Sequence, residues 1–227
     1  MRDVWMKWAV FVLVVVSIIF GADGCARRQD PQAGGAGIAV ADKKLQEGKF
    51  DFVYPEVTGM ADGQKQFRIN KLLRESAFRQ TNEIIEENKK VLTEEEQQKF
   101  SFQGRYEVKY NRNNILSVVF YNSSYMQGAA YPNNRQDSVT IDLGTGREYK
   151  LSDFFKAGTD YKKTVDDEVK SYIKRNDIQL SGDFNGINDN QAFYLKGKGV
   201  VVYFNDLTPH AVGVLEVPID KKHTILK

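Results

Sequence analysis

Reactive side chains are scarce in this sequence of 227 residues. Cys25 is the single cysteine, and His210 and His223 are the two histidines. One cysteine excludes an intramolecular disulfide, and a structural zinc site built from thiols and imidazoles would lack most of its four ligands. The sequence therefore predicts no metal site and no cofactor.

A large excess of charge of one sign is missing as well. The chain carries 32 Lys and Arg against 30 Asp and Glu, a formal net charge of +2. Nucleic-acid-binding domains usually show a clustered excess of basic residues. The sequence also lacks the serine-hydrolase elbow, the H-E-x-x-H zinc motif and the glycine-rich phosphate loops. We therefore expect no nucleic-acid partner, and no enzyme motif points to catalysis.

A long uncharged run is found near the N-terminus alone. Residues 9–22 form an uncharged stretch of 14 residues preceded by Arg2 and Lys7. This is shorter than the roughly 20 residues of a membrane span, and is typical of the apolar core of a secretory signal. The following residues, Ala22-Asp23-Gly24-Cys25, resemble the lipobox of bacterial lipoproteins. That resemblance implies lipidation of Cys25, although Asp23 stands where the family has a small neutral residue.

An uncut membrane anchor is the alternative. Val4 to Ala22 gives 19 residues in which Lys7 is the one charge. In both interpretations residues 1–25 are a signal peptide or membrane anchor. The chain is then tied to the cell membrane by a lipid or an N-terminal helix, and residues 26–227 lie on the extracytoplasmic face.

The remaining chain is predicted to hold a flexible tether and an α+β fold. Pro, Gly, Ala and charged residues without apolar periodicity predict a tether over 26–45. Residues 46–130 are expected to form an N-terminal α+β lobe and residues 131–227 a C-terminal lobe. Amphipathic helices are predicted at 64–90 and 160–175, and antiparallel strands or hairpins at 50–59, 101–126, 136–142, 192–205 and 213–219.

The segment 121–135, YNSSYMQGAAYPNNR, has the composition of a recognition surface. Tyrosine rings supply contact area and amides supply hydrogen bonds. The candidate ligand-binding residues are Tyr125, Gly128, Tyr131, Asn133, Asn134 and Arg135. Under the alternative, Tyr121 and Tyr125 pack inside as strand residues and the rest is a connection.

Two motifs carry a family resemblance over residues 50–220. DLGTGREYKLSDFF at 142–155 and the closing YFN…TPHAVG segment resemble the extracytoplasmic domain of RsiV-type anti-sigma factors. The same module pair resembles the N-terminal part of a peptidoglycan deacetylase and many bacterial lipoproteins. The resemblance implies an α+β fold outside the membrane and, for the anti-sigma members, binding of lysozyme.

Two departures limit what this resemblance implies. The family loop usually reads Gly-Gly-Ala-His, whereas Gln127-Gly128-Ala129-Ala130 stands here. Only eight residues precede Ala9, so we expect no sigma-binding segment.

Three hypotheses follow. The first is a membrane-tethered extracytoplasmic binding module that recognises a cell-wall component or a lysozyme-like protein. The second is a structural envelope lipoprotein without a specific ligand. The third is a cell-wall glycan hydrolase or deacetylase that uses acids such as Asp137, Asp142 and Asp153.

Overall fold

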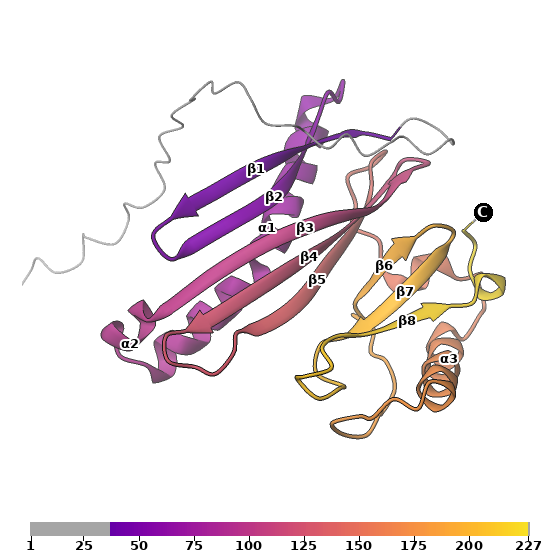
Figure 1. Ribbon diagram of the computed structural model, residues 1–227. Coiled ribbons are helices and arrows are strands. Elements are labelled where there is room, and N and C mark those ends of the chain that lie inside the picture. Colours follow the sequence, from indigo (N-terminus) through magenta and orange to yellow (C-terminus); the bar gives the residue numbers. More distant parts are fainter. Residues whose placement is uncertain (1–36, 227) are drawn as a thin grey trace, which may run out of the picture. The chain divides into compact units, whose positions relative to one another are not determined.

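The structure, a computed structural model, describes residues 37–226. It confirms the α+β class, with a five-stranded and a three-stranded sheet among these residues (Figure 1). The elements are β1 (Ala39–Glu47), β2 (Phe50–Thr58), α1 (Gly63–Val91), α2 (Glu94–Gln98), β3 (Phe100–Arg112), β4 (Ile115–Met126), β5 (Asn133–Asp142), η1 (Leu151–Phe154), α3 (Tyr161–Arg175), β6 (Phe193–Lys196), β7 (Gly199–Phe204), β8 (Leu215–Ile219) and η2 (Lys221–His223).

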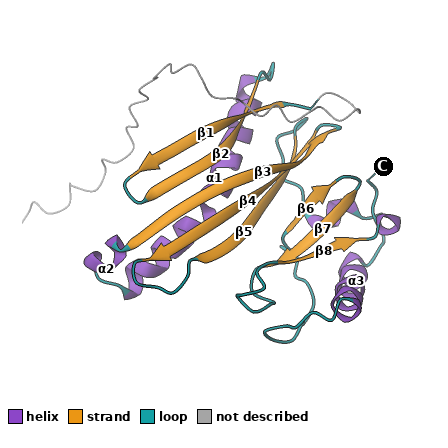
Figure 2. Cartoon of the chain, viewed as in Figure 1, coloured by secondary structure: helices purple, strands orange, loops and turns teal. Residues whose placement is uncertain are grey.

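The first sheet has the strand order β1-β2-β3-β4-β5, and α1 covers one of its faces (Figures 1 and 2). All neighbouring strands are antiparallel except β2 and β3, which run parallel over a short stretch. The β3–β4 hairpin turns at Asn113 and Asn114, whose φ angles are 53° and 58°. Two consecutive positive φ angles define a type I′ turn, in which asparagine is tolerated. The polar NRNN segment thus forms the predicted turn.

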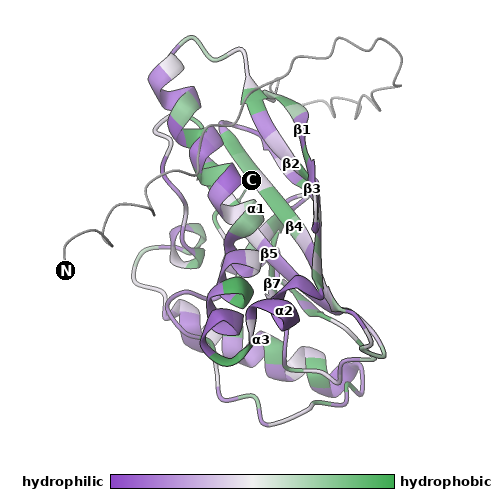
Figure 3. Ribbon diagram, turned by 90° about the vertical axis from the view of Figure 1, so that its left-hand side faces the viewer, coloured by the Kyte–Doolittle hydropathy of each residue, from purple (hydrophilic) through white to green (hydrophobic). Residues whose placement is uncertain are grey.

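Helix α1 packs through one apolar stripe. Ile69, Leu73 and Ala77, spaced four residues apart, are buried against Leu116, Val118, Phe120 and other sheet residues. Figure 3 shows hydrophobic and hydrophilic residues alternating along this helix. The helix begins after Asp62, whose carboxylate accepts a hydrogen bond from the backbone N–H of Lys65 at 2.9 Å.

Strand β1 corrects the predicted tether. Residues 39–47 pair with β2 along their full length, whereas the sequence predicted a flexible segment over 26–45. Most β1 side chains are exposed, so the strand shows no buried alternating pattern that would reveal it. Its pairing is reinforced by the Tyr106 hydroxyl, which donates to Asp42 at 2.6 Å. The tether residues before 37 lie outside the described residues.

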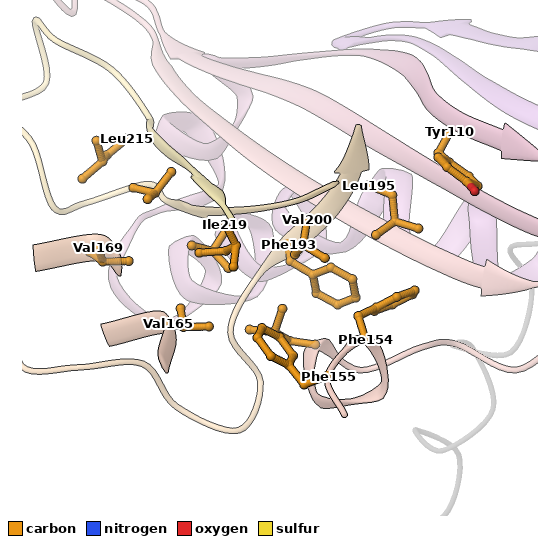
Figure 4. Close-up of a cluster of buried hydrophobic side chains, with 13 residues drawn as sticks. Tyr110, Phe154, Phe155, Val165, Val169, Phe193, Leu195, Val200, Leu215 and Ile219 are labelled. Atoms are coloured by element: carbon orange, nitrogen blue, oxygen red, sulfur yellow. The ribbon is translucent and has the colours of Figure 1, made fainter. Parts of the chain in front are cut away.

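The second sheet, β6-β7-β8, encloses a core with η1 and α3. Phe154 of η1 contacts Phe193 of β6 with ring centroids 5.6 Å apart. Val165 and Val169 of α3 are fully buried in the same cluster (Figure 4). Both predicted hairpin arms and the closing strand are present in this sheet.

Polar side chains of β4 and β5 connect the first sheet to the second. The Ser138 hydroxyl donates to the backbone carbonyl of Phe193 at 2.7 Å and accepts from the Tyr203 hydroxyl at 2.9 Å. Ser117 accepts from the backbone N–H of Leu195 at 3.0 Å. These bonds form a row of polar contacts between the two sheets. The described residues belong to one compact unit. Strand β5 pairs with β4, so the first sheet extends past residue 130, where the sequence placed the boundary between lobes.

Candidate functional site

A cleft lies over the face of β4 and β5 that is turned away from α1. Its volume is about 690 Å³. Side chains alternate along a strand, and Phe120 packs with α1, so Tyr121 and Ser123 face the cleft side. The described lining residues are Tyr121, Asn122, Ser123, Tyr131, Pro132, Asn134, Arg135, Gln136, His210, Ala211, Gly213 and Val214.

Three of the six predicted ligand-binding residues line this cleft. They are Tyr131, Asn134 and Arg135. Tyr131 lies at the rim with 65% of its surface exposed. Its ring meets the His210 ring edge-on, with centroids 5.3 Å apart and planes at 87°. The segment 127–132 and the loop after β7 therefore meet above the cleft.

The other three predicted residues lie outside the described lining. The Tyr125 hydroxyl donates to the backbone carbonyl of Ala129 at 3.3 Å, which closes the turn after β4. Gly128 has a φ of 93°, a left-handed conformation that favours glycine. Asn133 pairs with Ser124 at the start of β5. These residues shape the connection from β4 to β5.

The six candidate residues omit two groups of lining residues, although Tyr121 and Ser123 belong to the predicted recognition segment 121–135. Tyr121, Ser123 and Gln136 could have been found by extending the two-residue alternation of the strands to the face opposite α1. The second group, from His210 to Val214, follows β7 and lies about eighty residues further along the chain. No local pattern connects it to the first group.

Side-chain bonds fix the loop after β7 onto β5. Arg135 donates to both carboxylate oxygens of Asp206, at 2.9 and 2.7 Å. The Asn205 side chain accepts from the backbone N–H of Gln136 at 2.8 Å and donates to its carbonyl at 2.9 Å. The Asn205 side-chain amide thus bonds to the Gln136 backbone in the way that a neighbouring strand would. A bidentate guanidinium–carboxylate pair is also geometrically specific, so Arg135 is an anchor for this loop.

Gln136 contributes a buried polar group to the cleft. The residue is 4% exposed, and its Nε2 atom is buried without a hydrogen-bond partner within residues 37–226. An unsatisfied buried donor costs about 1–3 kcal/mol. The side chain lies on the same face of β5 as Ser138, because residues two apart point to one side.

Asp137 points to the opposite face of β5, toward α1. Its Oδ1 accepts from Arg79 at 3.2 Å and from the backbone N–H of Ser138 at 2.7 Å. Its Oδ2 is buried without a partner in the described part of the chain. Burial raises the pKa of Asp137 to about 6, because desolvation of the carboxylate outweighs the attraction of Arg79.

The three acids named as candidates for catalysis lie in separate settings. Asp142 accepts from the backbone N–H of Gly144 at 2.8 Å within a turn. Although burial opposes the effect, hydrogen bonds from Thr145 and Gly144 lower the pKa of Asp142. Asp153 accepts from Arg147 at 3.0 Å. None of these acids is among the described residues that line the cleft.

Two further findings concern the described residues alone. Among residues 37–226, no group of three or more His, Cys, Asp or Glu is placed to hold a metal ion. No helix in this part of the chain is long and apolar enough to cross a membrane. Cys25 and the predicted signal peptide or anchor lie outside the described residues.

Two family models match the sequence in succession. Residues 41–134 match the model described as Deacetylase PdaC, and residues 152–222 match Protein of unknown function (DUF3298). These matches confirm the module pair that the RsiV-like resemblance implied. No curated protein sequence matches the chain.

Solved structures share the fold. A DUF3298 family member from Bacteroides fragilis NCTC 9343 aligns with a TM-score of 0.62 and 17% identity, covering 83% of this chain and 92% of that one. A DUF3298 family protein from Pseudomonas aeruginosa PAO1 aligns with a TM-score of 0.55 and 9% identity, covering 82% and 89%. At these identities the likeness concerns the fold.

Proposed function

Because the chain joins a PdaC-type segment to a DUF3298 domain in an RsiV-like module pair, we propose that it is an extracytoplasmic binding module. Its ligand is a component of the cell wall, held in the cleft over β4 and β5. The single observation that carries this proposal is the cleft of about 690 Å³ lined by tyrosines, amides and His210. Ligand sites typically combine apolar and aromatic walls with a few placed polar groups.

The location follows from the N-terminal sequence. The uncharged run at 9–22 with its positive flank is expected to export the chain, and Cys25 or an uncut leader would tie it to the membrane. A tethered module positioned in this way would meet the cell wall as its nearest polymer. A lysozyme-like protein is the alternative occupant, and the experiment below separates the two.

Binding accounts for the site better than catalysis does. The PdaC description names a deacetylase, but Asp137, Asp142 and Asp153 are held by different local partners and line no common cleft. General acid–base catalysis needs such groups within hydrogen-bond reach of one reacting atom. The tyrosines and amides of the cleft can instead hold a ligand through contact area and hydrogen bonds.

The test is co-sedimentation of the full chain, in mild detergent, with purified peptidoglycan sacculi. Tyr131→Ala should reduce the bound fraction at least about fivefold, because the exposed ring at the rim supplies contact area and tyrosines are enriched among the residues that dominate binding energy. Phe67→Ala is the matched control, since Phe67 is equally exposed, at 66%, but lies on α1.

Three results would contradict the proposal. They are no binding by the wild-type chain, equal loss in both variants, and retention of immobilised lysozyme with no retention of sacculi. The last result would assign the cleft to a protein partner. Acetate release from the same sacculi, measured in parallel, would reveal deacetylation.

A further inference from the structure

We propose that one end of the fold docks on the anionic lipid surface of the membrane to which the chain is tethered. This inference rests on the membrane tether given under the proposed function, and it concerns a surface other than the cleft. The docking surface, called the basic end below, consists of Arg112, Lys196, Lys198 and Lys221.

The basic end forms where the β3–β4 hairpin meets the β6–β7 turn. Arg112 is the last residue of β3, and its guanidinium group donates a hydrogen bond to the backbone carbonyl of Gly197, between β6 and β7 (Figure 1). Lys196 and Lys198 stand on either side of this glycine, and both are exposed. The contact therefore brings three cations from two hairpins to one place.

Lys221 reaches the same end from β8. Val200 of β7 pairs with Ile219 of β8 in antiparallel register. Lys198 comes two residues before the first of these partners, and Lys221 comes two residues after the second. Antiparallel strands run in opposite directions, so both lysines extend beyond the pair to the same side. Lys221 is exposed as well.

The basic end lacks neutralising carboxylates. None of its four cations forms an ion pair within residues 37–226. Asp220, which precedes Lys221, pairs with Lys222 at 3.1 Å. Asp142, which pairs with Ile115 beside the β3–β4 turn, accepts hydrogen bonds from backbone N–H groups of its own turn. Unpaired like charges repel one another and attract a surface of opposite charge. Charge complementarity therefore favours an anionic partner.

The place where the chain enters the fold favours a membrane as that partner. Ile38, which leads into β1, exchanges two hydrogen bonds with the side chain of Asn111, at 3.0 and 2.8 Å. Asn111 precedes Arg112, so the N-terminal segment joins the fold beside the basic end. The twelve residue steps from Cys25 to Gly37 span at most about 43 Å at full extension. A lipid on Cys25, or an uncut leader before it, would hold this end close to the membrane.

Docking through the basic end would turn the cleft away from the membrane. Arg112 pairs with Ile115 at the start of β4, and Ser123 of the cleft lies eight residues further along that strand. Eight residues of a strand span about 27 Å. The second wall of the cleft, at 210–214, precedes β8, whereas Lys221 follows it. Both walls therefore lie far from the docked end and would face the cell wall.

The test is amine footprinting of the full chain reconstituted in vesicles. Vesicles of phosphatidylcholine are compared with vesicles of equimolar phosphatidylcholine and phosphatidylglycerol. A membrane-impermeant reagent acetylates the lysines, and mass spectrometry gives the rate at each one. The lysines of the basic end and the neighbouring Lys222 should react at least about fivefold more slowly on the anionic vesicles, because lipid contact covers them and stabilises their protonated amino groups. This protection should disappear in 1 M salt, where the Debye length is about 3 Å.

An internal control is available at the other end of α1. Lys90 is exposed and lies near the C-terminal end of this helix of 29 residues. A helix of that length spans about 43 Å, and its first turn lines a cavity together with Ile38 and Arg112. Lys90 is therefore far from the basic end, and its rate should be the same on both kinds of vesicle.

Two charge-reversal variants locate the interaction. The test variant is Lys196→Glu/Lys198→Glu/Lys221→Glu. The matched control, with the same change of net charge at the far end of the first sheet and α1, is Lys89→Glu/Lys90→Glu/Lys99→Glu. All six side chains are exposed, so neither variant should disturb the core, and urea unfolding verifies this. Protection of Lys222 on anionic vesicles should be lost in the test variant and kept in the control.

The outcomes separate this inference from the proposed function. Equal footprints on the two kinds of vesicle, or protection that survives in the test variant, would overturn the inference and leave the tether in place. Loss of sacculi binding in the test variant, without any difference between vesicles, would assign the basic end to an anionic wall polymer instead. A chain that floats with neither vesicle would remove the tether and the inference together. Failure of sacculi binding alone would remove the cleft as a wall-binding site and leave this inference standing.

Discussion

The carboxyl group of Asp137 should make the protein less stable as the pH rises from about 4 to 6. The residue is 8% exposed, and its two oxygens are in unequal positions. Oδ1 receives hydrogen bonds from Arg79 and from the backbone N–H of Ser138, while Oδ2 is buried without a partner among residues 37–226. Nearby Glu83 and Glu148 further disfavour the ionised form. Asp137→Asn removes the titration and nearly preserves the shape.

The sign and magnitude follow from proton linkage. The pKa of Asp137 rises from 3.8 to about 6 on folding. The folded state therefore holds its proton more tightly than the unfolded state. The resulting stability is fully present below about pH 4 and is lost as the pH passes through 6. A shift of about two units corresponds to ~3 kcal/mol at 1.36 kcal/mol per unit. We expect the measured change to be about 2–3 kcal/mol.

Urea unfolding at pH 4, 5, 6 and 7 measures this effect. The free energy of unfolding of Asp137→Asn, minus that of the wild type, should increase by this amount across the series. Asp142→Asn is the control, because hydrogen bonds lower the pKa of Asp142, and its linkage to folding therefore has the opposite sign. Its difference from the wild type should not increase across the series. A flat or decreasing difference for Asp137→Asn would refute the reasoning.

Two further predictions concern stability and use urea unfolding of the full chain. Ser138→Ala removes the acceptor of the buried Tyr203 hydroxyl and a donor to a backbone carbonyl of β6, so it should cost about 2 kcal/mol. The double variant Ser138→Ala/Tyr203→Phe should lose less unfolding free energy than the two single variants added together, because both changes remove the same hydrogen bond. Strictly additive losses would contradict a bond between these two hydroxyl groups. Gly104→Ala should cost about 1–3 kcal/mol by overpacking, since its Cβ would lie 2.3 Å from Phe52 Cδ1. Gly63→Ala, with nothing within 4 Å, should be neutral or stabilising.

Elements with strong periodicity were predictable from the sequence. The Ile69, Leu73 and Ala77 stripe identified α1, and the alternating β4 sequence identified a strand, because both bury one face against a core. The Asn113–Asn114 turn was predictable from residue type. Strand β1 escaped detection because an edge strand with exposed side chains is held by backbone pairing, and that pairing leaves no hydrophobic signature.

The candidate site was predictable in part for a related reason. Tyr131, Asn134 and Arg135 stand close together in sequence, in a segment whose composition is unusual. The opposite wall depends on a contact between residues 71 positions apart, the Arg135–Asp206 pair. Residue types alone cannot select that partner among 30 acidic residues. Side-chain alternation could have added Tyr121 and Gln136, had the face opposite α1 been treated as a binding surface.

The cleft is built from residues of both matched segments. The PdaC-type match ends at residue 134 and the DUF3298 match begins at 152, and β5 lies mostly between them. Strand β5 pairs with β4 on one side and bonds to the second sheet through Gln136 and Ser138. One wall of the cleft comes from the first segment and the other, at 210–214, from the second. Neither segment could build the cleft alone, so a ligand held there would contact both modules and stabilise their junction by binding the assembled state preferentially.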